Sequence, residues 1–268
     1  MMTDESTLLE LCRHVVASGE RMGATAVEAQ AASTSEVESN IELSQISGVN
    51  RKDLDGIAVR AFVGKRMGSA FTNIPTKKAV EEALSLALQA AKASTPDEDW
   101  TSLPKPARYP VIKGLWHDSV AECDSARIVE FAEDYMSRAI MAEPGLTPAY
   151  GGSGTGSKHS AYANSNGIEH AERGTTAYVF LAAIAQIESG VTPAVGSYDI
   201  RRDLEFDLDW VVEDIVSMIR LCKKTAEGNT GSHTVIFPLG YGPVVDEGVP
   251  RRRTPIIEIG RASCRERV

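Results

Sequence analysis

The sequence predicts an α+β fold: an N-terminal α/β domain with a mixed or antiparallel sheet, a second α+β domain, and a truncated C-terminal domain. Two observations carry this prediction. Strand-like segments are grouped rather than alternating strictly with helices, which disfavours a doubly wound parallel sheet. The composition, with 43% hydrophobic and 24% charged residues, is that of a globular chain rather than a disordered or fibrous one.

The first predicted domain, residues 1–95, starts and finishes with a helix. Apolar side chains recur at helical spacing over residues 5–22, with Asp4 or Ser6 as a possible cap, and again from Thr76 to about Ala93. Between these helices, alternating apolar residues predict strands. The predicted strands cover residues 25–32, 36–46, 57–63 and 67–72, the last two forming a hairpin around Gly64-Lys65.

A proline-containing stretch without helical periodicity predicts a linker at residues 96–116. The second domain, residues 117–228, has predicted helices from Asp124 to about Met141 and from Asp207 to about Thr225. Strands are expected at 160–163 and 175–187, around a turn at Asn164-Ser-Asn-Gly167. Residues 229–257, with a strand at 234–237, would begin the truncated C-terminal domain.

The final segment, residues 258–268, has no hydrophobic periodicity. Its residues Ile259 to Val268 resemble the translated sequence of a sequencing-library adapter. We therefore expect an artefactual tail, which is excluded from fold reasoning, and a natural protein that continues differently.

The charge and composition exclude some classes of function. A net charge of −9 disfavours nucleic-acid binding, and no apolar run reaches the roughly 20 residues of a membrane span. The acidic N-terminus does not resemble a signal peptide, so a cytoplasmic location is expected. Cys12, Cys123, Cys222 and Cys264 show no paired spacing, which favours free buried thiols.

Two groups of residues could carry chemistry. The stretch Gly151–Lys158 resembles a phosphate-binding loop, but Ser157 stands where such a loop needs lysine, so a mobile or tight loop is the better interpretation. His159 and His170 flank the predicted hairpin and could be neighbours that hold a metal, although a polar strand face is the simpler interpretation. We assign no catalytic, cofactor-binding or metal-binding residue.

Several motifs together resemble the TldD/PmbA family. They are Gly56-Ile-Ala-Val-Arg60, the hairpin Gly64–Asn73, and the run Ala161–Thr176 with its Asn-Ser-Asn-Gly turn. The resemblance covers about residues 5–245 and implies a zinc peptidase of two related subunits. In such a pair, a TldD-like chain carries His-Glu-x-x-x-His and cuts peptides, and a TldE (PmbA)-like chain lacks this motif.

The catalytic motif is missing from this chain. Asp246, Glu247 and Arg251 fall where the family resemblance implies His, Glu and His. Arginine offers no lone pair to a metal, and Pro250 disfavours a helix interior. The resemblance therefore implies the non-catalytic subunit, with zinc in its TldD-like partner and an unfolded peptide as substrate.

Two other hypotheses remain. The chain could be an atypical metallopeptidase whose ligands include His159, His170, Asp246 or residues beyond the printed sequence. It could also be a non-enzymatic peptide-binding module of the same fold. Stoichiometric zinc in the full-length chain alone would favour the first, and the lack of a TldD-like partner would favour the second.

Overall fold

The computed structural model describes residues 2–108, 110–188, 190–224, 230–237 and 257–263. The chain divides into two compact units, Met1–Lys223 and Lys224–Val268. Both predicted domains, 1–95 and 117–228, therefore lie almost entirely within the first unit, where they share one sheet. Each unit is described by itself.

The helices of the first unit begin at the caps that the sequence provides. Their bounds are α1 Glu5–Arg21, α2 Lys77–Ala93, α3 Asp118–Ala121, α4 Ser125–Ala142 and α5 Leu208–Cys222. The side chains of Asp4, Thr76, Asp124 and Asp207 accept hydrogen bonds from first-turn amides of α1, α2, α4 and α5. The four long helices are confirmed. None of the helices in the described part of the chain is long and apolar enough to span a bilayer.

One antiparallel sheet joins the two predicted domains. Its strands are β1 Ala26–Glu42, β2 Gln45–Val63, β3 Arg66–Thr72, β4 Leu146–Asn164, β5 Glu169–Ile187, β6 Gly190–Val191 and β7 Val195–Arg201. Their order is β3-β2-β1-β4-β5-β6, with β7 also on β5. Because β1 pairs with β2 on one side and β4 on the other, it connects the two halves. The α+β prediction is confirmed, and every described pairing is antiparallel.

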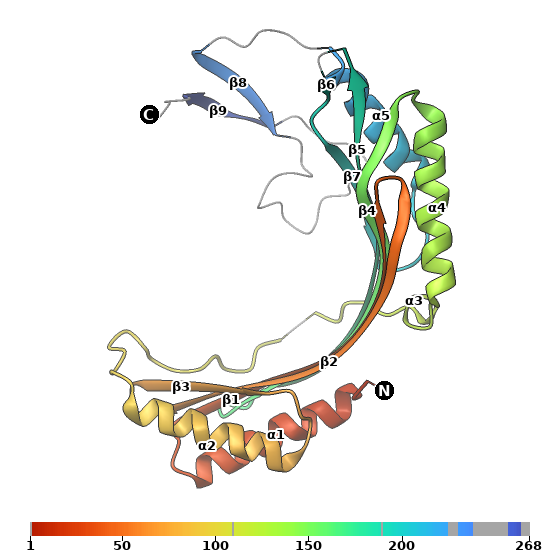
Figure 1. The fold of residues 1–268 in the computed structure, drawn as a ribbon. Helices are drawn as coiled ribbons and strands as arrows, with labels where there is room; N and C mark the ends of the chain where they lie inside the picture. The colour runs from red at the N-terminus through yellow and green to blue at the C-terminus, as the bar shows by residue number, and fades with distance from the viewer. Residues whose placement is uncertain (1, 109, 189, 225–229, 238–256, 264–268) are drawn as a thin grey trace. The chain divides into compact units, whose positions relative to one another are not determined.

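All four long helices cover the same face of this curved sheet (Figure 1). We call this the outer face and the opposite one the inner face. Helices α1 and α2 pack at one end over Val27, Ala29 and Val59, and α4 and α5 pack at the other over Ile41 and Val179. A glycine allows α2 to lie close to β3, since a Cβ on Gly68 would lie 2.1 Å from the Ala87 carbonyl oxygen of α2. Two apolar cores thus share one sheet.

The strands are longer than predicted. The segments expected at 25–32 and 36–46 are mostly one strand, β1, which ends at Glu42, and a turn at Leu43 and Ser44 then leads into β2. Buried serines on its outer face, Ser33, Ser35 and Ser39, interrupt the apolar alternation that marks a strand. The sequence also gives no signal for the turn, because Leu43 and Ser44 adopt positive φ values of 47° and 66° at positions where glycine would be expected.

The loop predicted for Gly151–Lys158 is wrong: these residues form the middle of β4. At Gly151, Gly152 and Gly154, neighbouring atoms leave no room for larger side chains. A Cβ on Gly152 would lie 2.1 Å from the Ser39 carbonyl oxygen, and one on Gly154 would lie 2.6 Å from the Tyr178 ring. The glycines therefore serve sheet packing and not a phosphate.

The second unit contains the strand pair β8 Ser232–Phe237 and β9 Ile257–Ser263, which is antiparallel. The strand predicted at 234–237 is confirmed as part of β8. Strand β9 falls mainly in the segment expected to be an artefactual tail, where no strand was predicted. The origin of that tail stays a prediction.

Candidate functional site

Residues from separate motifs meet at one end of the inner face. Strand pairing places Glu28 of β1 directly opposite Arg60 of β2 and Asn164 of β4. The Arg60 guanidinium forms an ion pair with the Glu28 carboxylate, and the Tyr162 hydroxyl donates to the other oxygen of Glu28 at 2.5 Å. The Asn164 amide nitrogen in turn donates to the Tyr162 hydroxyl oxygen at 3.2 Å. We call these four residues the inner-face network.

The inner-face network surrounds one buried carboxylate with hydrogen-bond partners. The Glu28 side chain is only 8% exposed, so its charge requires the partners that Arg60 and Tyr162 supply. Burial, followed by the hydrogen bond to Glu28, raises the pKa of Tyr162 to about 12. A carboxylate engaged on both oxygens and a phenol with a raised pKa favour a positioning role over proton transfer at neutral pH.

The turn Asn164–Gly167 fixes the linker to this network. The Asn164 side-chain oxygen accepts from the backbone amides of Asn166 and Ile168, both at 3.0 Å, and Gly167 has a φ of +93°. The amide nitrogens of Asn164 and Asn166 donate to the linker carbonyls of Pro104 (3.0 Å) and Leu103 (2.5 Å). The expected turn is confirmed, and its asparagines act as a clamp on the linker.

The linker crosses from the inner face to the outer face. On the inner face the Trp100 ring stacks on Phe62 with centroids 4.4 Å apart. At the other end of the linker, the Leu115 carbonyl accepts a hydrogen bond from the Thr175 amide of β5 at 2.8 Å. Trp116 then meets His159 edge-on at 5.2 Å. The predicted linker is thus anchored to the sheet near both of its ends.

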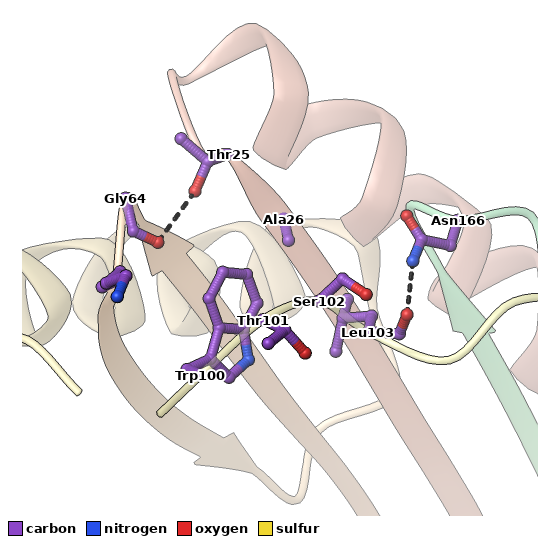
Figure 2. Close-up of a pocket in the computed structure, with 9 residues that line it drawn as sticks. Thr25, Ala26, Gly64, Trp100, Thr101, Ser102, Leu103 and Asn166 are labelled. Carbon is purple, nitrogen blue, oxygen red and sulfur yellow. Dashed lines mark hydrogen bonds between the residues drawn. The ribbon is translucent and has the colours of Figure 1, made fainter. Parts of the chain in front are cut away.

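A shallow pocket of about 400 Å³ lies beside the clamp (Figure 2). Trp100 and Leu103 of the linker, Thr25 and Ala26 at the start of β1, and Asn166 of the turn contribute to its walls. Lys65 also lines it, but its ammonium group is held by the Glu98 carboxylate at 2.8 Å. The pocket offers hydroxyl groups and an aromatic wall, without a convergent set of charged groups.

His159 and His170 do not share a site. His159 lies on the outer face, where Nδ1 is 2.5 Å from a Glu5 carboxylate oxygen, and His170 lies opposite Tyr162 on the inner face. The expectation that they could be neighbours is therefore wrong. Strand pairing places His159 opposite Arg173 and His170 opposite Tyr162, and these two pairs project to opposite faces of the sheet.

The described part of the chain offers no place where zinc would fit. It contains no group of three or more His, Cys, Asp or Glu side chains arranged to hold a metal ion. Asp246, Glu247 and Arg251 lie outside the described residues. Among the described cysteines, Cys12, Cys123 and Cys222 are free thiols, as expected, but only Cys12 is buried, whereas Cys123 and Cys222 are half-buried.

Sequence reasoning missed Glu28 and Trp100. Arg60, Tyr162 and Asn164 stood inside the quoted motifs, but only the pairing of β2, β1 and β4 brings them together around the Glu28 carboxylate. The sequence pattern did not distinguish Glu28, because it occupies a polar position of the alternating segment 25–32, as Gln30 does.

The fold and these motifs define a class of two-layer α+β proteins in which one curved antiparallel sheet carries two pairs of helices. The chain belongs to the PmbA/TldD family. Residues 27–93 match the family model "PmbA/TldA metallopeptidase domain 1", and residues 71–227 match "PmbA/TldA metallopeptidase central domain". No curated protein matches the sequence.

Solved structures agree with this assignment. TldE from Thermococcus kodakarensis is 25% identical, with a TM-score of 0.77, over 85% of this chain and 51% of that one. A putative modulator of DNA gyrase from Bacteroides thetaiotaomicron is 16% identical, with a TM-score of 0.75, over 88% and 54%. A similar protein from Thermotoga maritima is 10% identical, with a TM-score of 0.70, over 85% and 51%. The chain spans about half the length of these structures.

Proposed function

We propose that this chain is part of a TldE-like, non-catalytic subunit of a zinc metallopeptidase that acts on unfolded peptides. In this proposal a TldD-like chain supplies the zinc ligands and the general base. The subunit described here supplies a rigid sheet against which the partner and the peptide are arranged.

One observation carries the proposal: a chain similar to TldE over most of its length has no His-Glu-x-x-x-His among its 268 residues. Zinc hydrolysis needs metal ligands together with a base that takes a proton from the bound water. None of the five histidines is followed by glutamate in the printed sequence. The inner-face network is consistent with a supporting role, because its carboxylate is already neutralised by Arg60.

The test uses the intact gene in three preparations. In the first, its product is expressed alone, and in the second it is expressed together with a TldD-like chain from the same genome. In the third, the TldD-like chain carries a Glu→Gln change in its His-Glu-x-x-x-His motif. Zinc content and cleavage of an unfolded peptide are measured for each preparation. We expect zinc in every preparation that contains the TldD-like chain, and cleavage only from the pair with the intact motif.

Other outcomes would overturn the proposal in different ways. One zinc per full-length chain in the absence of a partner, together with cleavage, would establish the atypical metallopeptidase hypothesis. A chain that binds unfolded peptide but never associates with a TldD-like chain would instead be a peptide-binding module. A cytoplasmic location stays a prediction, and cell fractionation would test it.

A further inference from the structure

Asn166, in the turn that clamps the linker, is the only asparagine of the printed sequence that is followed directly by glycine. Such a pair is reactive, because glycine has no side chain to hinder its backbone nitrogen from attacking the side-chain carbonyl carbon of the asparagine. Gly167 is exposed and Asn166 is half-buried, so water reaches both residues. The turn therefore contains the residue pair that forms a cyclic imide.

This reaction needs no reactant other than water. The Gly167 nitrogen forms a bond to Cγ of Asn166, the bond from Cγ to Nδ2 breaks, and Nδ2 leaves as ammonia with the proton that the Gly167 nitrogen gives up. Water then opens the imide at Cγ, which yields aspartate, or at the backbone carbon, which yields isoaspartate. No atom is oxidised or reduced. Both products carry a negative charge that Asn166 lacks.

In the folded chain, both reacting groups are engaged in other contacts. The Gly167 amide donates to the Asn164 backbone carbonyl at 3.0 Å. Asn166 Nδ2 donates to the Leu103 carbonyl at 2.5 Å, so the linker holds this side chain (Figure 2). An intramolecular attack is fast only when the reacting atoms are close and correctly oriented. The linker therefore slows the reaction for as long as it stays bound to the turn.

The product of the reaction is incompatible with the contact to the linker. The amide of Asn166 is a donor for the Leu103 carbonyl, whereas a carboxylate offers only acceptors. Two acceptor oxygens at hydrogen-bond distance repel each other, so the carbonyl has to move away. Leu103 is buried against Ala26 and Phe62, and it lines the shallow pocket together with Asn166. Conversion therefore loosens this end of the linker and changes one wall of the pocket.

We propose that Asn166 is a site of self-modification, at which attack by the Gly167 nitrogen replaces the amide with a carboxylate and loosens the linker from the sheet. The bound linker limits the rate of conversion, and conversion in turn weakens the binding of the linker. Because ammonia is lost, the change is irreversible. This property is separate from the pairing with a TldD-like chain and can be measured on this chain alone.

Peptide mapping by mass spectrometry tests the chemistry. Conversion at Asn166 is followed at pH 8 in the folded chain and in a synthetic peptide of residues 163–171. We expect the peptide to convert at least about tenfold faster, because in the folded chain the turn has to open first. Trp100→Ala removes the stacking on Phe62 without changing the turn, and should raise the rate in the folded chain about fivefold. Trp210→Ala, on α5, is the matched control and should leave the rate unchanged. Circular dichroism confirms that each variant is folded.

Two results would overturn this part of the proposal. In one, the folded chain converts as fast as the peptide, so the linker gives no protection. In the other, Asn166 stays intact in Trp100→Ala while the peptide converts completely.

Limited digestion with trypsin tests the consequence for the linker. Cleavage after Arg108, an exposed linker residue, should be about fivefold faster in Asn166→Asp than in the unsubstituted chain. In the unsubstituted chain, this cleavage should become faster with time of incubation. Asn166→Gln closes a larger ring much more slowly, so its cleavage rate should stay constant. Asn73→Asp adds the same charge at an exposed position away from the linker contact. Equal cleavage rates in Asn166→Asp and Asn73→Asp would overturn the proposal.

Discussion

At the scale of single residues, the inner-face network couples one buried charge to the position of the linker. Glu28 is held by Arg60 and Tyr162, and Tyr162 accepts from Asn164, whose side chain also holds the carbonyl of Pro104. A change at Arg60 or Tyr162 therefore removes a partner from the buried Glu28 carboxylate. Removing one partner from a buried polar group costs more than an exposed hydrogen bond contributes.

Tyr162→Phe removes the hydrogen bond to Glu28 and the acceptor for Asn164. We expect the free energy of unfolding at pH 8 to fall by about 1–2 kcal/mol in urea titrations. The pKa of Tyr162, raised from 10.0 to about 12, adds a pH effect. The neutral phenol is favoured in the folded state, so its contribution is complete below pH 10 and is lost as the pH rises to about 12.

The variant should accordingly show a shallower loss of stability between pH 10 and 12. Some loss remains, because burial also raises the pKa of Tyr178 to about 12. Tyr150→Phe, at a residue that is 53% exposed, is the control and should leave both measurements unchanged. An identical alkaline profile for Tyr162→Phe and the unsubstituted protein would contradict the coupling.

Asn164→Ala should release the linker. It removes one linker contact, to Pro104, and the acceptor of two turn amides, so we expect a loss of about 2–3 kcal/mol in the free energy of unfolding. Trypsin should also cut faster after Arg108. Asn73→Ala, at an exposed position, should change neither. If the variant lost zinc-dependent cleavage in the assembled enzyme without losing stability, the clamp interpretation would be wrong.

At the scale of elements, helices were predictable and strand lengths were not. The four long helices carry apolar side chains at helical spacing and a capping residue at the start, and both signals are local. The strands β1 and β4 are stabilised by neighbours far away in the sequence. Buried serines in β1 and glycines in β4 suit those neighbours but conceal the alternation from which a strand is predicted.

The same reasoning explains what was missed at the site. The turn at Asn164–Gly167 follows from local residue preferences, and it was predicted. The contact of Glu28 with Arg60 and Tyr162 depends on the register of three strands, which the sequence pattern did not define. The separation of His159 from His170 is a register effect as well, since one residue more or less would have placed them on one face.

Gly68→Ala tests the fit between an element and its neighbour. The added methyl group would lie 2.1 Å from the Ala87 oxygen and 2.3 Å from the Ala91 nitrogen, so α2 has to move away from β3. We expect a loss of about 1–3 kcal/mol in the free energy of unfolding. Gly156→Ala is the control, because the nearest atom to its methyl group, Glu36 Cγ, lies at an ordinary 3.7 Å.

If both alanine variants lost the same stability, the packing of α2 on Gly68 would not be the cause, because Gly156 has no such close neighbour. If Gly156→Ala were stabilised and Gly68→Ala were destabilised, the result would clearly support the close packing of α2 on Gly68 as the cause. Thermal unfolding followed by circular dichroism is sufficient to separate these cases.

At the scale of the whole first unit, two apolar cores share one sheet. The first contains Leu84 of α2, and the second contains Ile215 of α5, and β1 contributes residues to both. Because breaking either core exposes part of β1, we expect residues 2–223 to unfold as one cooperative unit and not as two domains divided at the linker.

Two tryptophans can report on this cooperativity. Trp100 lies over the end of the sheet that carries α1 and α2, and Trp210 belongs to α5. In single-tryptophan variants the two urea transitions should coincide. Leu84→Ala should lower both midpoints together, at a cost of about 2–5 kcal/mol, and so should Ile215→Ala. Transitions that separate in either variant would instead support two independent domains.

The arrangement of β2 has a consequence for solubility. One of its sides pairs with β3 only at Ile57–Val63, and within the described residues no strand pairs with that side of Gln45–Gly56. An unpaired edge is a template on which further chains can be added, and charged side chains are one means by which proteins prevent such addition. The run Arg51-Lys52-Asp53 and the nearby Asp55 place charges of both signs on this stretch, so a feature that would otherwise promote aggregation carries its own protection.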